Sequence, residues 1–266
     1  MNLEDTHADI LQKACGGLGI DRAALARKTG LTSAALEPAF GPKPNPATLR
    51  LLAVALGLVP DRLEAIAKGT YAPEAGQIPR GVLQFTTPFR DMTVNSYLVW
   101  DGQSGKAAAF DTGADCSGML EEIAARNLRL ESVFLTHSHI DHVCDLPRLV
   151  ERTGARAWSC EPVRGAETFA PGHPFSLGDL KISTGLTCGH SPAGITYVVR
   201  GLGRPVAIVG DALFAGSMGG GKVSYADALR TTRAEILSLP LDTLLGPGHG
   251  PWTTVAQEIA HNPFFP

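Results

Sequence analysis

Three histidines and an aspartate lie within one short segment, directly after an apolar run. Residues 132–136 are β-prone and predict a strand, and the chain continues as His137-Ser138-His139-Ile140-Asp141-His142. Loops at strand ends are where α/β sheets place ligands. Imidazole nitrogens beside a carboxylate suit zinc, and also iron or manganese. The segment therefore predicts a metal site at the edge of an α/β sheet, rather than a solvated histidine-rich loop.

Three further candidate ligands follow far downstream, each at the end of a β-prone run. They are His190, Asp211 and His249, and a glycine precedes each of them. A single residue of this kind is commonly part of a turn. Three in this order after a histidine-rich segment favour one shared site, so the residues indicate a metal site on an α/β domain.

The first 70 residues have a helical pattern. Apolar side chains recur at three- and four-residue spacing, and Gly30, Gly57 and Gly69 are stop signals. Helices are predicted over residues 8–14, 22–29, around 34–36, 47–56 and 62–68. We therefore predict a small helical domain over residues 1–70. Two prolines and a glycine in the next segment predict a linker over residues 71–80.

The remaining residues, 81–266, alternate between two patterns. Short β-prone runs occupy residues 82–86, 95–100, 107–111, 132–136, 180–186, 196–199 and 206–209. Helical stretches fall between or after them, at residues 117–126, 146–152, 225–237 and 255–260. This alternation predicts a layered α/β domain with sheet inside and helices outside.

The histidine-rich segment, together with His190, Asp211 and His249, resembles the motif set of the metallo-β-lactamase superfamily and its glyoxalase II-like hydrolases. The resemblance spans about residues 82–266. It implies a four-layer αββα sandwich, here preceded by a small all-α domain, and two divalent metal ions, with Zn²⁺ favoured over Fe or Mn. By position it assigns the first metal to His137, His139 and His190, the second to Asp141, His142 and His249, and the bridge to Asp211.

Hydrolysis is the chemistry expected of such a centre. Two cations roughly 3.5–4 Å apart share a water and lower its pKa, so that a metal-bridging hydroxide attacks a carbonyl or phosphorus centre. Asp141 and Asp211 are the predicted catalytic carboxylates. The resemblance favours a thioester or another ester-type small molecule as substrate. Lactones, phosphodiesters and β-lactams stay open, because the sequence shows no counterpart of the C-terminal helical domain of true glyoxalase II enzymes.

Two alternative functions stay open at this point. A mononuclear-iron sulfur dioxygenase would reuse much of the same ligand set. A transcriptional regulator would use the metal domain only to sense a ligand.

Residues 24–32 and 46–57 resemble the helix-turn-helix domain of Cro/C1-type repressors. The charge balance argues against efficient DNA binding, because eight basic side chains face seven acidic ones over residues 1–70. The segment from Ser33 to Pro38, where a recognition helix would lie, has no Arg, Lys, Gln or Asn to read base edges, and Pro38 would break it. We expect a helical module that covers the active site or forms a homodimer.

Charge and cysteine usage predict an ordinary cytoplasmic protein. The net charge is −3, and no apolar run is long enough to span a bilayer. The N-terminal residues lack the pattern of a signal peptide. Five cysteines are scattered without paired spacing, which is typical of a reducing compartment.

Residues 216–223 nearly match a phosphate-binding P-loop. Val223 stands where a Ser or Thr must hold Mg²⁺, so we reject nucleotide binding. Lys222 and Tyr225 are candidate contacts for an anionic substrate, and solvated loop residues otherwise. Cys144 and Cys188 each lie two residues from a predicted ligand, and we expect both to be small buried side chains.

Overall fold

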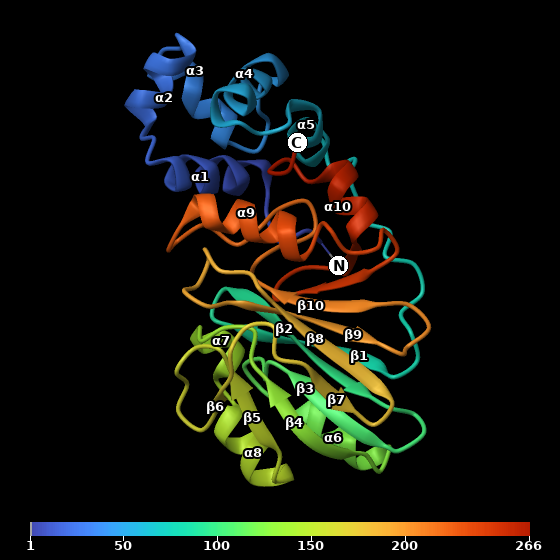
Figure 1. Cartoon of the computed structure of the whole chain (residues 1–266). Helices are drawn as coiled ribbons and strands as arrows, with labels where there is room; N and C mark the ends of the chain where they lie inside the picture. Colours follow the sequence, from blue (N-terminus) through green and yellow to red (C-terminus); the bar gives the residue numbers. More distant parts are fainter. Residues whose placement is uncertain (1) are drawn as a thin grey trace.

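Two six-stranded sheets lie face to face in the computed structural model, which describes residues 2–266 (Figure 1). The first sheet has the strands β1 (Val82–Phe89), β2 (Met92–Trp100), β3 (Lys106–Phe110), β4 (Arg129–Phe134), β5 (Arg156–Ser159) and β6 (Glu167–Thr168), in that order. The second sheet has the reverse order along its width, from β12 (Thr253–Thr254) through β11 (Leu244–Pro247), β10 (Val206–Gly210), β9 (Ile195–Arg200) and β8 (Leu180–Leu186) to β7 (Phe175–Leu177).

Helices cover the outer face of each sheet (Figure 1). On the first sheet lie α6 (Ser117–Ala125) and α8 (Leu146–Thr153), and on the second lie α9 (Tyr225–Glu235) and α10 (Val255–His261). The short helix α7 (Ile140–Val143) sits at the end of β4. This is the four-layer αββα sandwich of the metallo-β-lactamase type that the sequence predicts, preceded by a helical region.

Alternation along β3 shows how the sequence builds these layers. Ala107 and Ala109 face α6 and α8, whereas Ala108 and Phe110 face the second sheet, because successive strand side chains point to opposite faces. All four side chains are buried. A strand that is apolar on both faces must be covered on both, and the fold meets this requirement with a helix layer and a second sheet.

Strand direction brings distant segments to one edge. In the first sheet β3, β4 and β5 are parallel. In the second sheet β10 and β11 are parallel, and β9 is antiparallel to both β8 and β10, so that β8 runs the same way as β10. The carboxyl ends of β8, β10 and β11 therefore meet at the same edge of their sheet.

The helices that precede the sandwich are α1 (His7–Leu18), α2 (Arg22–Thr29), α3 (Ser33–Leu36), η1 (Glu37–Phe40), α4 (Pro46–Leu56) and α5 (Pro60–Ala67). Asp21 caps α2 by accepting a hydrogen bond from the Ala24 amide, and α2 ends at the predicted stop signal Gly30, in the left-handed conformation. In α3, Thr32 is the cap, and the chain tightens into η1 around Pro38. The predicted helices are confirmed, although α5 begins at Pro60 rather than after Asp61.

One hydrophobic core joins these helices to the sandwich. It contains Leu11 of α1 and Leu25 of α2 together with Leu213 and Phe264 from the second half of the chain. Polar contacts follow the same interface: the Val59 amide donates to the Pro263 carbonyl at 2.9 Å. The N-terminal helices therefore pack as a further layer over α9 and α10 rather than hanging from a linker (Figure 1).

Several short elements have no counterpart among the predictions from sequence. They are α7, β5, β6, β7, β11 and β12, each of which has four residues or fewer. The predicted strand over residues 132–136 ends earlier, at Phe134. Within residues 2–266, none of the helices is long and apolar enough to cross a bilayer.

Candidate metal centre

All seven predicted ligands lie at the carboxyl ends of four strands. His137 and His139 follow β4, and Asp141 and His142 lie in α7 immediately after them. His190 follows β8, Asp211 follows β10 and His249 follows β11. The sheet edge that strand direction creates is therefore the place where the two motif regions of the sequence meet.

The first half of the centre comprises His137, His139, His190 and Asp211, whose ligand atoms all lie within 4.8 Å of one another. Nδ1 of His139 lies 2.9 Å from Nε2 of His137 and 3.0 Å from Nε2 of His190. Oδ2 of Asp211 lies 3.3 Å from Nε2 of His190. Three ring nitrogens and one carboxylate oxygen thus converge on a common point.

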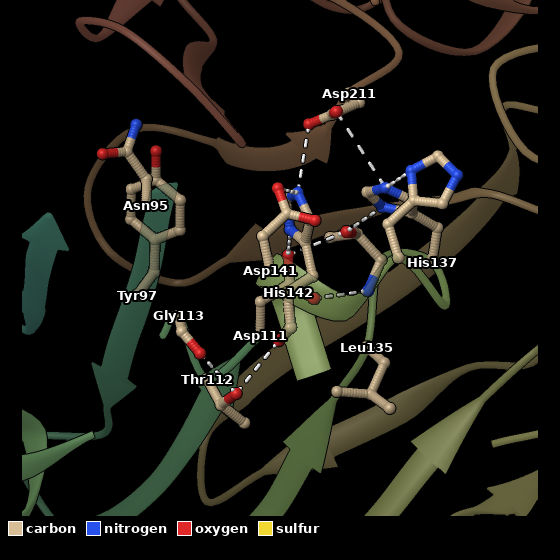
Figure 2. Close-up of polar contacts among 12 residues, drawn as sticks. Asn95, Tyr97, Asp111, Thr112, Gly113, Leu135, His137, Asp141, His142 and Asp211 are labelled. Atoms are coloured by element: carbon tan, nitrogen blue, oxygen red, sulfur yellow. Dashed lines mark hydrogen bonds and ion pairs between the residues drawn. The ribbon is translucent and has the colours of Figure 1, made fainter. Parts of the chain in front are cut away.

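The second half comprises Asp141, His142 and His249, again with ligand atoms within 4.8 Å of one another. Oδ2 of Asp141 lies 3.7 Å from Nε2 of His142 and 3.4 Å from Nε2 of His249. Oδ1 of Asp211 lies 3.2 Å from Nε2 of His142 and 3.5 Å from Nε2 of His249. Asp211 therefore turns one oxygen to each half of the centre, and Figure 2 shows it between His137 and His142.

Four of the imidazoles are held from behind through their other nitrogen. Nδ1 of His142 donates to Asp111 at 2.7 Å, Nδ1 of His190 to the Gly220 carbonyl at 3.0 Å, and Nδ1 of His249 to the Thr93 carbonyl at 2.6 Å. Nδ1 of His137 lies 3.0 Å from the Thr136 hydroxyl. Such contacts fix the ring orientation and tautomer, and they are typical of histidines that bind metals.

Asp111 is a buried carboxylate at the end of the β-prone run over residues 107–111. Its φ is 56°, a left-handed conformation that is uncommon for a residue other than glycine. It accepts hydrogen bonds from the Thr136 amide at 2.7 Å, from the Thr136 hydroxyl at 2.8 Å and from His142 (Figure 2). Asp111 therefore connects the loop after β4 with α7.

Glu161 connects the two loops that hold the first half of the centre. Its carboxylate is buried and accepts hydrogen bonds from the amide of Ser138 at 3.0 Å and from the amide of Ala193 at 2.9 Å. Ser138 lies between His137 and His139, and Ala193 lies three residues after His190. No signal in the sequence marked Glu161, because it follows a strand that the sequence patterns did not reveal.

Asn95 of β2 holds the loop that carries His249. Its side-chain amide donates to the carbonyls of Pro247 at 3.0 Å and Gly250 at 2.9 Å, and its backbone amide donates to Gly248 at 2.8 Å. The sequence pattern predicts only a β-prone run over residues 95–100 and gives no sign of this role. The structure explains the position, because β2 crosses directly beneath this loop.

Burial governs the imidazoles of the first half. It lowers the pKa of His137 well below the ordinary range, and it lowers the pKa of His190 to about 4. It also lowers the pKa of His139. Because a histidine must be neutral to donate a lone pair, these three rings are prepared to act as ligands near neutral pH.

Carboxylates govern the second half. Although burial opposes it, Asp111 and Asp211 raise the pKa of His142 to about 10. Against the same effect of burial, Asp211 and Asp141 raise the pKa of His249 to about 11. Burial also acts to raise the pKa of Asp211, yet His249 and His142 hold it well below its usual range. This half of the centre therefore attracts positive charge.

The residues fit a pair of divalent cations by an observation that is independent of the resemblance. Nε2 of His142 and Oδ1 of Asp211 are buried and have no hydrogen-bond partner, which is costly unless another group occupies the space between them. Gly248 keeps this space open, since a Cβ there would lie 2.2 Å from Oδ1 of Asp211. Nitrogen donors with carboxylate oxygens suit zinc, iron or manganese.

Other residues near the centre differ in their surroundings. Lys222 is exposed, and its charge acts on His139 and His190. The Tyr225 ring packs edge-on against Phe264, and it would collide with a Cβ at Gly17, so Tyr225 belongs to the contact between α1 and α9. The prediction of a buried Cys144 was wrong: the thiol is exposed, because it follows the last turn of α7. Cys188 is half-buried.

A cavity of about 690 Å³ lies beside the histidine-rich segment. Its walls are mostly apolar and come from α7, α8 and the loop after β5, with Ile140, Val143, Leu146, Val150 and Val163 among them. Ser138 and Cys144 supply polar atoms, and Arg164 supplies a positive charge. The cavity therefore offers a small apolar group a place next to the centre.

Comparison with known proteins agrees with this geometry. Residues 90–175 match the family described as the Metallo-beta-lactamase superfamily. The hydroxyacylglutathione hydrolase GloC of Haemophilus influenzae is 27% identical over 197 residues, which cover 64% of this chain and 92% of that protein. An uncharacterized protein of Aquifex aeolicus is 31% identical over 206 residues, with 66% and 94% covered. Among solved structures, ETHE1 from Myxococcus xanthus superposes with a TM-score of 0.61 at 26% identity, covering 68% of this chain and 83% of that one.

These alignments leave about a third of this chain without a counterpart. The matched part has the layered fold, the strand ends and the cluster of ligand-type side chains described above. The fold, the alignments and the position of the ligand-type side chains at the strand ends agree, and the chain belongs to the metallo-β-lactamase superfamily.

Proposed function

We propose that this protein is a dinuclear-metal-dependent hydrolase that acts on a thioester or another ester-type small molecule. The proposal depends on how the two carboxylate oxygens of Asp211 are directed. Oδ2 faces His190, whereas Oδ1 faces His142 and His249. A carboxylate that served a single cation would have no reason to turn its second oxygen to another set of ligands.

The residues have separate tasks in this scheme. His137, His139 and His190 would hold one cation, Asp141, His142 and His249 the other, and Asp211 both. When bound, such cations lower the pKa of a water and polarise the oxygen of the reacting carbonyl. Asp141 is the most exposed carboxylate of the centre, so it is placed to accept a hydrogen bond from a water that enters.

The surroundings of the centre support an ester-type substrate. The apolar cavity beside Ile140 and Val143 can take an acyl group, and the exposed Lys222 on the side of His139 and His190 can approach an anionic group. The Haemophilus influenzae relative is named a hydroxyacylglutathione hydrolase, and hydroxyacylglutathiones are thioesters. Each of these features is compatible with a small acyl thioester.

A hydrolysis screen with protein of measured metal content tests the proposal. Thioester, ester, lactone, β-lactam and phosphodiester substrates would be compared in the wild type and in Asp211→Asn. Asp242→Asn, an exposed position, is the matched control. We expect turnover of a thioester or ester that the Asp211 variant loses by at least about 100-fold and the control retains. Turnover that is unchanged in Asp211→Asn would contradict the proposal.

A mononuclear-iron sulfur dioxygenase is the second candidate, because this chain superposes on ETHE1 from Myxococcus xanthus. The arrangement of Asp141, His142 and His249 favours the hydrolase. A single cation in the first half would leave these three converging side chains without a cation to bind. Oxygen consumption with a thiol-derived substrate, together with one iron per chain, would favour the dioxygenase instead.

Regulation of transcription is the third candidate, and it depends on the N-terminal helices. The helix α3 has only four residues, and its exposed side chains are those of Ser33, Ala34 and Ala35. These are poor groups for reading base edges. We therefore propose that the helices complete the enzyme rather than bind DNA, and tight sequence-specific binding in a gel-shift assay at low salt would overturn this view.

A further inference from the structure

Glu4, which precedes the first helix, lies against the loop that carries His249. A Cβ at Gly250 would come within 3.2 Å of the Glu4 amide nitrogen and 3.3 Å of Glu4 Cβ. Glu4 is half-buried, and its carboxyl interacts electrostatically with His249 and Asp211. A segment far from the ligands in sequence therefore borders the site that the strand ends build.

Asp5 attaches this segment to the loop that follows Asp211. Its carboxylate accepts a hydrogen bond from the Ser217 hydroxyl at 2.5 Å and forms an ion pair with Lys13 of α1. The ammonium of Lys13 also donates to the Met218 carbonyl at 2.8 Å. The Asp5 side chain is only 8% exposed, and a charge pair that is buried and hydrogen-bonded defines a position better than a solvated one does.

Phe214 connects α1 with His249 itself. The ammonium of Lys13 lies 4.8 Å from the centre of the Phe214 ring. The same ring makes a T-shaped contact with the imidazole of His249, with 5.4 Å between ring centres. The N-terminal helix is therefore separated from a proposed metal ligand by a single aromatic side chain.

Glu4 and Asp5 differ in how their charges are used. Asp5 is neutralised by Lys13, whereas in the part of the chain that the structure describes no cationic side chain forms an ion pair with Glu4. The exposed Lys222 acts on His139 and His190, in the first half of the centre. Two charges of opposite sign thus lie over different halves of the centre.

We propose that Glu4 lies in the wall of the substrate site beside His249 and is a specificity-determining residue there. The inference rests on the proposed hydrolase function of the same centre. A half-buried carboxylate attracts a cationic group and repels an anionic one. The part of the substrate that lies beside His249 therefore carries an ammonium or another cationic group.

Binding of thiols to the metal-loaded protein tests this inference without turnover, because thiolates bind zinc directly. Three probes of similar size differ in charge: thiocholine is cationic, N-acetylcysteamine is neutral and 3-mercaptopropionate is anionic. Their dissociation constants would be measured by calorimetry for the wild type, Glu4→Gln and Glu4→Lys. Glu121→Gln, at an exposed position of α6, makes the same change of charge and is the control.

We expect the preference for the cationic over the anionic probe to fall about three- to tenfold in Glu4→Gln, and further in Glu4→Lys. Affinity for the neutral probe, the metal content and the control stay as in the wild type. An unchanged preference would overturn the inference while leaving the hydrolase proposal intact. Loss of a metal equivalent in Glu4→Gln would also overturn it, because Glu4 would then be a ligand. A wild type that binds none of the three thiols would also overturn the inference, whereas the hydrolase proposal is overturned separately, by the hydrolysis screen with Asp211→Asn.

Discussion

Asp111 accepts a hydrogen bond from Nδ1 of His142 at 2.7 Å, and both side chains are buried. The left-handed backbone of Asp111 costs of the order of 1 kcal/mol, so the surrounding structure must stabilise it. The contact directs Nε2 of His142 towards Oδ1 of Asp211. Asp111, which contacts a proposed ligand and not the proposed cations, is therefore part of the centre.

Replacing Asp111 with Asn tests this relationship. An amide cannot accept from both the Thr136 amide and His142 in the present geometry, so the imidazole loses its fixed orientation. We expect affinity for the second metal equivalent to fall about 10- to 100-fold, measured by competition with a chromogenic chelator. Asp115→Asn, which changes an exposed carboxylate nearby in the sequence, is the control. Equal affinities in the two variants would refute the role of Asp111.

Glu161→Gln separates the positioning of the first half from that of the second. The carboxylate accepts from the amides of Ser138 and Ala193, and the NH₂ group of a glutamine would face one of these donors. We expect the first metal equivalent to bind about tenfold more weakly and the second to bind normally. The comparison is Glu167→Gln, which removes only a surface pair with Arg156. A uniform loss at both equivalents would show that Glu161 supports the fold in general.

Glu258 makes stability depend on pH. It is fully buried, and although the Tyr71 hydroxyl and other groups donate to it, burial raises its pKa from 4.5 to about 7. Between these two values the unfolded chain ionises at this position and the folded chain does not. The Glu258 contribution to the free energy of unfolding therefore falls as pH rises through this range, by about 3 kcal/mol at most.

The measurement is chemical denaturation of the wild type and Glu258→Gln between pH 5 and pH 8. Titration of the proposed metal ligands affects both proteins and cancels in the difference. We expect the wild type to lose stability relative to the variant as pH rises. A difference that does not change with pH would show that Glu258 is ionised throughout.

Leu11→Ala tests whether the N-terminal helices and the sandwich form one folding unit. Leu11 is fully buried in the core that also contains Leu213 and Phe264. We expect one cooperative unfolding transition by both circular dichroism and tryptophan fluorescence. The free energy of unfolding should fall by about 2–5 kcal/mol in the variant. Leu18→Ala, on the same helix but 44% exposed, should change stability little. A separate early transition of the helices would contradict the shared core.

The sequence predicted the parts of this protein that have a regular spacing of apolar residues or a local motif. Helix ends followed from stop signals such as Gly30 and Gly57, and the ligands followed from a motif of unusual composition. The strand β3 followed from the β-prone run over residues 107–111. Each of these rests on short-range chemistry that is visible in the order of the residues.

The parts that could not be predicted depend on contacts across the fold. Glu161 and Asn95 are ordinary polar residues until strands far apart in the chain bring them beneath the ligand loops. Short strands such as β6 and β12 have too few residues to show alternation. The position of Glu4 beside Gly250 depends on the packing of the N-terminal helices over α9. The predicted homodimer, the boundaries of the domains and the cytoplasmic location stay predictions.

The metal-to-protein ratio tests the central claim most directly. Wild-type protein loaded with zinc and freed of excess ions should contain two equivalents by plasma mass spectrometry, and Asp211→Asn should contain one or none. Asp242→Asn, the surface control, should contain two. A wild type that retains a single equivalent, or an Asp211 variant that retains both, would contradict a centre of two cations joined by this carboxylate.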